Sequence, residues 1–232
     1  MMIRRGETLK RIMRLDKPPP VWYNTANYDT KDRFEMTQTR EAALTRQTSE
    51  TSITLSVALD GDGGSEIVTG VGFFDHMLTH IARHGLLHLS VHATGDLHID
   101  DHHTVEDIGI ALGQALREAI GDKAGITRYG FSNVPMDEAL VACALDWSGR
   151  GLLVQDFVFP SPKIGTFDTE LVAEFFRAVA ANAGLTLHFE QRRGTNSHHI
   201  AEAAFKAFGR ALDMAKRQDS RVLGIPSTKG VL

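Results

Sequence analysis

The sequence predicts an α+β fold that arose by tandem duplication, in which each half reads strand, strand, helix, strand, helix. Three observations support this prediction. Polar and apolar residues alternate in several short segments, apolar residues recur at helical spacing in four longer ones, and one cluster of histidines and a glutamate occurs twice. Because helices and half-buried sheets must each bury an apolar face, we expect the helices to pack against the sheets.

The first half begins with a strand, because apolar residues alternate with polar or small ones over 53–59. The segment 60–64 is rich in glycine and aspartate and marks a turn, after which residues 66–69 are expected to pair back on the strand. The same periodicities then predict the remaining elements: a helix over 73–83, a strand over 87–93 and a helix over 105–120.

The second half repeats this order. Strands are expected over 126–134, 139–146 and 152–159, then a helix over 170–183, a strand over 185–190 and a helix over 198–216. Aligning the halves matches residues 111–116 with 207–212, Phe73-Phe74 with Phe175-Phe176, and Leu97-His98 with Leu187-His188. The shared order of elements indicates the duplication more strongly than these weak identities do.

Residues 1 to about 40 differ from the rest, because they contain the run Pro18-Pro19-Pro20 and no sustained apolar period. A disordered or loosely attached extension is expected there, and its acidic residues argue against a transit peptide. Met36 is an alternative start. A single domain over 41–232 should follow, with halves of about 46–122 and 123–220 and a C-terminal tail.

The bulk composition narrows the class of protein. A chain of 232 residues with a formal net charge of −4 is long enough for a real core and is not charged like a nucleic-acid binder. A single cysteine, Cys143, excludes an internal disulfide framework and fits a reducing cytosol. No apolar run approaches the ~20 residues that a membrane helix needs. We therefore expect a cytoplasmic protein that binds neither nucleic acid nor membrane.

The most informative motif is His-His-x-x-Glu. On a helix the first histidine and the glutamate lie four residues apart and the second histidine three, so all can share one face. Imidazole nitrogens and a carboxylate oxygen form a ligand set for a divalent transition metal. Adjacent histidines at a helix start bring no packing advantage, which favours a metal site. The two copies are His102, His103 and Glu106, and His198, His199 and Glu202.

Further residues extend this candidate site. His76 lies on the shorter helix before the first motif, and Glu174 takes the corresponding place before the second. Each half is therefore expected to supply its own set, His76 with the first motif and Glu174 with the second. Metal-bound histidines usually donate their other ring N–H to a carboxylate, so Asp100, Asp101 and Asp107 are candidates for that role.

Basic and hydroxyl residues elsewhere suggest a phosphate group on the ligand. Arg128 and Arg150 follow turns or strand ends, and the segment 225–230 near the C-terminus contains a serine, a threonine and a lysine. Guanidinium, ammonium and hydroxyl groups are what a phosphate monoester needs. Taken singly, each is more typical of a solvated surface residue.

The chemistry alone leaves several functions open. A di-metal phosphatase or amidohydrolase would use the same ligands and basic residues, and a non-catalytic metal-binding shell would use the ligands alone. Longer strings decide between them, because they closely resemble imidazoleglycerol-phosphate dehydratase. They are residues 73–78, 95–107, 135–140 and 196–199 together with the Pro-Ser-x-Lys-Gly terminus, and the resemblance runs from about Arg46 to the end.

The resemblance implies a manganese-dependent hydro-lyase of histidine biosynthesis. Such an enzyme converts D-erythro-imidazole-glycerol phosphate to imidazole-acetol phosphate, with two Mn²⁺ per active site gripping the imidazole ring. It also implies a helical layer between two mixed or antiparallel sheets, of the ribosomal S5 domain 2-like type. Finally, it implies a homo-oligomeric shell of 24 subunits with active sites at subunit interfaces.

The resemblance carries over to individual residues. Glu50 matches a substrate-contacting glutamate and is the candidate for proton transfer. Relatives often have histidine where this chain has Glu174, and glutamate also binds manganese, so we expect it to be a ligand. The other expected metal ligands are His76, His102, His103, Glu106, His198, His199 and Glu202. The residues expected to bind the phosphate are His84, Arg128, Arg150, Ser227 and Lys229.

Overall fold

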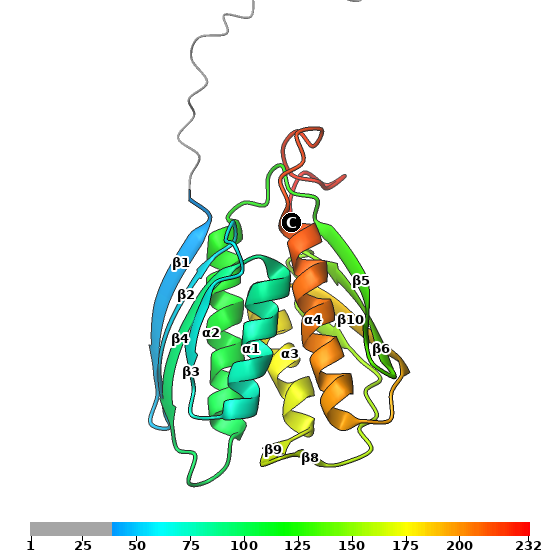
Figure 1. The fold of residues 1–232 in the computed structure, drawn as a ribbon. Helices are drawn as coiled ribbons and strands as arrows, with labels where there is room; N and C mark the ends of the chain where they lie inside the picture. The colour runs from blue at the N-terminus through cyan, green and yellow to red at the C-terminus, as the bar shows by residue number, and fades with distance from the viewer. Residues whose placement is uncertain (1–38) are drawn as a thin grey trace, which may run out of the picture. The chain divides into compact units, whose positions relative to one another are not determined.

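The computed structural model describes residues 39–232, which form two four-stranded sheets with four helices packed between them (Figure 1). The predicted N-terminal extension, and with it the choice of Met36 as a start, lies almost wholly outside the described residues. No helix within 39–232 is both long and apolar enough to cross a membrane.

The elements follow one another in the predicted order. Those of the first half are β1 (Glu41–Gln47), β2 (Thr51–Ala58), β3 (Ser65–Val68), α1 (Gly72–Gly85), β4 (His88–Gly95) and α2 (His102–Ile120). Those of the second half are β5 (Tyr129–Met136), β6 (Ala139–Asp146), β7 (Leu152–Val154), β8 (Lys163–Ile164), β9 (Phe167–Asp168), α3 (Glu170–Ala183), β10 (Thr186–Arg193) and α4 (Ser197–Lys216).

The two sheets have the same topology, which confirms the duplicated α+β fold. Their strand orders are β1-β2-β4-β3 and β5-β6-β10-β7, and in each the last strand is the only parallel one among the described pairs. The first sheet therefore has one strand more than predicted, whereas the four strands of the second sheet match the four predicted ones. In the first half the missed strand is β1, an edge strand in which only Ala42 is buried.

The predicted pairing of residues 66–69 with the preceding strand is wrong, because β3 pairs with β4 instead. The reason lies in the turn after β2. Gly61 donates its N–H to the Leu86 carbonyl at 3.1 Å, and a Cβ on Gly61 would lie 2.2 Å from the nitrogen of His88. The chain therefore crosses the start of β4 and runs beside it.

The structure also corrects part of the internal alignment. β4 and β10, and likewise α1 and α3, start 98 residues apart. Leu187 therefore corresponds to Leu89 rather than Leu97, and Phe175 corresponds to Met77 rather than Phe73. Residues 111–116 and 207–212 are 96 residues apart, as are His102 and His198 at the starts of the two motifs, so this part of the alignment agrees with the structure. Glu174 lies 98 residues after His76 and does correspond to it.

Helices of opposite halves pack against each other, α2 on α3 and α1 on α4. Both pairs meet at a glycine. A Cβ on Gly113 would lie 2.9 Å from the Val179 carbonyl oxygen, and one on Gly209 would lie 3.1 Å from that of Ile81. Because Val179 also corresponds to Ile81, the two helix pairs have equivalent contacts. The residues near the N-terminal ends of α2 and α3 therefore have the same relative positions as those near the N-terminal ends of α4 and α1.

The contact of β5 with α4 also depends on a glycine. A Cβ on Gly130 would lie 1.8 Å from the Ala211 carbonyl oxygen, so Gly130→Ala must push the strand off the helix. We expect a loss of about 1–3 kcal/mol in unfolding free energy, measured by denaturant titration. Gly72→Ala is the control, because no atom lies within 4 Å of its added Cβ. Equal stability of the two variants would contradict the tight packing.

Candidate metal centre

Three predicted ligands from two helices come together at the start of α4. Asn196 caps this helix, and its side chain accepts hydrogen bonds from the backbone nitrogens of His198 and His199. His198 Nε2 then lies 3.0 Å and His76 Nε2 3.6 Å from Glu202 Oε2. One ligand atom from each of His76, His198 and Glu202 falls within 4.8 Å of the others, and we call these residues the His76 group.

The carboxylate of the His76 group is buried and held. Its other oxygen, Oε1, lies 2.6 Å from Lys206 Nζ and 3.3 Å from His80 Nε2. Burial alone would raise the pKa of Glu202, but Lys206 and His80 outweigh it and hold that pKa at about 2. Burial lowers the pKa of His80 to about 4. At neutral pH an ionised carboxylate therefore presents Oε2 to two imidazoles.

The first motif is more open. His102 Nε2 lies 3.8 Å from Glu106 Oε2, and these side chains are 41% and 47% exposed, against 7% for Glu202. Glu174 sits on the helix that packs against this motif, where its carboxylate is paired with Arg177. We call Glu174, His102 and Glu106 the Glu174 group. Among residues 39–232, only the ligand atoms of the His76 group, and not those of the Glu174 group, all lie within 4.8 Å of one another.

The expected assignment of short-helix ligands is therefore wrong. His76 meets the second motif rather than the first, because α1 packs against α4. Likewise, α3 brings Glu174 to the side of α2, which carries the first motif. Each group thus combines residues from both halves of the duplication, and this crossing is visible in the pairing of the helices (Figure 1).

The second histidine of each motif is held by a carboxylate. His103 Nδ1 lies 3.0 Å from Asp96 and His199 Nδ1 2.7 Å from Glu138, and these hydrogen bonds raise the pKa of both histidines. The bond to His199 also lowers the pKa of Glu138 to about 2. Because Nδ1 is engaged, Nε2 is the nitrogen that each ring offers to a metal.

These orienting carboxylates differ from the predicted ones. Asp100 instead accepts a hydrogen bond from the backbone of His102, and Asp107 is bound by Arg46 and Thr51. Asp96 precedes the helix that carries His103, and Glu138 lies between β5 and β6, 61 residues before His199. Neither contact could therefore be predicted from helical spacing. The only sequence signal for them is their place in the strings 95–107 and 135–140.

Most of the predicted phosphate-binding residues gather near the C-terminal tail. Arg128 Nε donates to Asp146 at 2.7 Å, and its Nη1 donates to the Pro226 carbonyl at 2.8 Å. Arg150 Nη2 lies 3.7 Å from the same aspartate. The Ser227 hydroxyl accepts from the backbone of Lys229 at 3.2 Å. The structure thus brings these residues to one end of α4.

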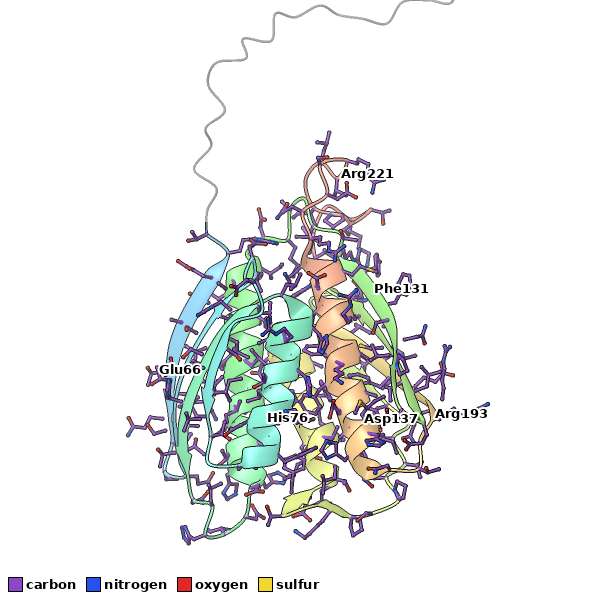
Figure 2. All side chains as sticks on the ribbon, in the orientation of Figure 1. Glu66, His76, Phe131, Asp137, Arg193 and Arg221 are labelled. Atoms are coloured by element: carbon purple, nitrogen blue, oxygen red, sulfur yellow. The ribbon has the colours of Figure 1, made fainter. Side chains whose placement is uncertain are left out.

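The phosphate-binding residues lie far from the His76 group. The backbone nitrogen of Arg128 donates to the carbonyl of Ala215, which is 17 residues beyond His198 on α4. At 1.5 Å per residue this separation is about 25 Å. Figure 2 shows the same arrangement, with His76 toward one end of the helical layer and Arg221 of the tail at the other.

His84 is the predicted phosphate-binding residue that lies on the metal side. It sits two turns after His76 on α1, and its pKa is lowered by burial and by the nearby cations of Lys206 and Arg210. Lys206 and Arg210 were missed by sequence reasoning, although they follow Glu202 at helical spacing. They make the surroundings of His84 basic.

Glu50 lies beside the first motif. It is in the loop between β1 and β2, and its Oε2 is 3.9 Å from Nδ1 of His103. Its backbone is held on both sides, since its nitrogen donates to Thr48 Oγ1 and its carbonyl accepts from Asp96. The carboxylate is about half exposed and is therefore free to meet a ligand.

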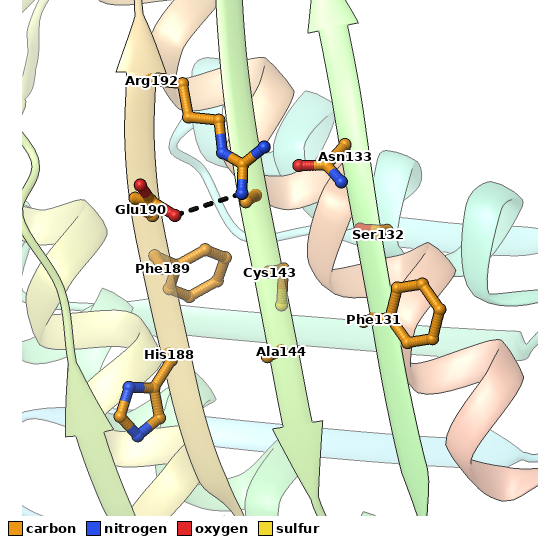
Figure 3. A pocket seen from close by; sticks show the side chains of 10 residues that line it. Phe131, Ser132, Asn133, Cys143, Ala144, His188, Phe189, Glu190 and Arg192 are labelled. Atoms are coloured by element: carbon orange, nitrogen blue, oxygen red, sulfur yellow. Dashed lines mark hydrogen bonds and ion pairs between the residues drawn. The ribbon is translucent and has the colours of Figure 1, made fainter.

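A hollow of about 320 Å³ on the outer face of the second sheet contains none of the predicted site residues (Figure 3). Its lining includes Phe131, Cys143 and His188, with Glu190 and Arg192 paired across one side at 3.2 Å. This face lies opposite to the helical layer that carries the histidine motifs. The hollow is therefore separate from the candidate metal centre.

Comparison with known proteins gives a consistent result. The sequence profile of the imidazoleglycerol-phosphate dehydratase family matches residues 69–212. The protein of that name from Acidiphilium cryptum is 62% identical over 194 residues, which cover 83% of this chain and 99% of the relative. The one from Desulforamulus reducens is 61% identical over 193 residues, covering 83% and 98%.

Solved structures agree. Imidazoleglycerol-phosphate dehydratase from Staphylococcus aureus matches with a TM-score of 0.71 and 46% identity, covering 77% of this chain and 99% of that one. The enzyme from Pyrococcus furiosus, solved in complex with (S)-C348, matches with a TM-score of 0.71 and 39% identity, covering 82% and 100%.

Proposed function

The chain belongs to the imidazoleglycerol-phosphate dehydratase family and is a hydro-lyase. From this premise we propose that it dehydrates D-erythro-imidazole-glycerol phosphate to imidazole-acetol phosphate in histidine biosynthesis. The observation that carries the proposal is the His76 group, in which two imidazoles and a buried carboxylate converge. The basic residues near the tail suit the phosphate of this substrate.

The donor set fits a divalent cation. The His76 group offers two nitrogens and one oxygen within 4.8 Å of one another, and its carboxylate is ionised at neutral pH. Because the Nδ1 atoms of His103 and His199 are held by carboxylates, the Nε2 atoms of these rings add two further donors. We propose that two Mn²⁺ per active site are held by the His76 group, the Glu174 group and these two histidines.

Such cations would stabilise negative charge on the imidazole ring of the substrate, which activates the neighbouring carbon. The chain itself has to move the proton and hold the other end of the substrate. Glu50 is a carboxylate beside His103 and is suited to shuttle the proton. Arg128, Arg150, Ser227 and Lys229 are suited to bind the phosphate.

We further propose that each active site combines residues of different subunits. The phosphate-binding cluster lies about 25 Å from His198, whereas a molecule of this size reaches across roughly 10 Å. One chain therefore cannot use both clusters on one substrate molecule. A shell of 24 subunits, as the family resemblance implies, would bring the metal residues of one copy to the tail of another.

Metal removal tests the proposed reaction. Protein stripped with a chelator should not turn over imidazole-glycerol phosphate, and Mn²⁺ should restore the formation of imidazole-acetol phosphate. Other divalent cations, added one at a time, provide the comparison, and free phosphate is measured in parallel. Restoration by no cation would overturn the proposal, and release of phosphate would show a phosphatase instead.

A further inference from the structure

We propose that the two metal positions are unequal in chemical preference: the His76 group favours imidazole-seeking cations such as Zn²⁺, and the Glu174 group favours Mn²⁺. This inference rests on the proposed function, because it assumes that both groups bind a cation. It concerns one difference between the repeats, the carboxylate of Glu174 where the other repeat has the imidazole of His76.

The equivalence of the two helix pairs makes this comparison valid. Gly113 meets the carbonyl of Val179 as Gly209 meets that of Ile81, so α3 lies on α2 as α1 lies on α4. Glu174 is five residues before Val179, as His76 is five before Ile81. Glu174 is therefore related to His102 and Glu106 as His76 is to His198 and Glu202.

The donor atoms of the two groups differ in kind. The His76 group has two imidazole nitrogens and one carboxylate, whereas the Glu174 group has one imidazole and two carboxylates. Imidazole suits zinc, copper and nickel, while carboxylates suit magnesium and manganese. A tenfold difference in relative affinity corresponds to about 1.4 kcal/mol, which one exchanged ligand can supply.

The surroundings act in the same direction. Oε1 of Glu202 is occupied by Lys206 at 2.6 Å, so Glu202 can offer only Oε2, and the His76 group stays poor in oxygen. Glu106 is 47% exposed and Glu174 is 30% exposed, so water can complete an oxygen-rich shell at the Glu174 group. Arg177 pairs with Oε2 of Glu174, which leaves the other carboxylate oxygen, Oε1, for a cation.

Competition between metals tests the inference in the assembled protein. Protein loaded with Mn²⁺ is titrated with Zn²⁺, and the released Mn²⁺ is followed by its electron paramagnetic resonance signal. Half of the bound Mn²⁺ should leave first, and the other half should need a Zn²⁺ concentration at least about tenfold higher. Glu174→His should merge the two steps at the lower concentration.

The mirror variant His76→Glu is the matched control, and it should merge the two steps at the higher concentration. Anomalous scattering from wild-type crystals grown with both metals gives an independent readout, with zinc expected at the His76 group. A single release step in the wild-type protein, or zinc at the Glu174 group, would overturn the inference alone. Binding of fewer than two Mn²⁺ per chain would overturn the proposed metal centre as well.

Discussion

Replacing Glu50 by glutamine is expected to lower the turnover of imidazole-glycerol phosphate by about 100- to 10,000-fold, the usual contribution of a general acid–base group. Glutamine keeps the size of the side chain but cannot carry the proton. The fold should not change, because the carboxylate is about half exposed and the loop is held through backbone atoms of Glu50. Steady-state kinetics of the Mn²⁺-loaded variant measure the effect.

Two measurements make this result interpretable. Mn²⁺ binding to Glu50→Gln should match that of the wild-type protein, since Glu50 is outside both proposed ligand groups. Glu190→Gln is the control for loss of a carboxylate, because Glu190 is paired with Arg192 on the outer face of the second sheet. Full turnover by Glu50→Gln with both metals bound would show that another group moves the proton.

Two inactive variants should restore activity to each other when their subunits are mixed. Glu202→Gln damages the metal end of the chain, and Arg150→Ala combined with Lys229→Ala removes two exposed charges from the phosphate end. Each protein alone should lose at least about 100-fold in turnover, since charged hydrogen bonds contribute about 1.5–3 kcal/mol each. After joint dissociation and reassembly, up to roughly one site in four should be intact.

This recovery follows from the separation of about 25 Å between the two ends of α4. The control is a chain that carries all three substitutions. It supplies neither an intact metal end nor an intact phosphate end, so it should stay inactive when it is mixed with either of the two variants. Size-exclusion chromatography confirms that the mixed subunits have assembled. A mixture as inactive as its parents would show that one chain supplies both ends of its own site.

Sequence periodicity predicted the elements well where the pattern was strong. The predicted ranges 139–146 and 170–183 coincide with β6 and α3, because both have clear apolar faces. β1 was missed, since only Ala42 on this edge strand is buried. β3 was assigned the wrong partner, because the contact that redirects the chain at Gly61 involves residues 25 or more positions away.

The ligand types were predictable, but their grouping was not. The spacing within His-His-x-x-Glu correctly placed His198 and Glu202 on one face of a helix, since that relation is local. Which motif His76 joins depends on how helices from the two halves pack, and no local pattern contains this information. The reaction itself came from the resemblance, because the same ligands serve several di-metal enzymes.

The crossed pairing of the helices bears on the ancestry of the chain. A half-length polypeptide would carry a motif on its long helix, but the helix that completes the group would belong to another molecule. Two such polypeptides would have to dimerise before either could hold a cation. Fusion of the two into one gene then makes that dimer permanent. It also frees the copies to diverge, which is how glutamate at 174 and histidine at 76 can coexist.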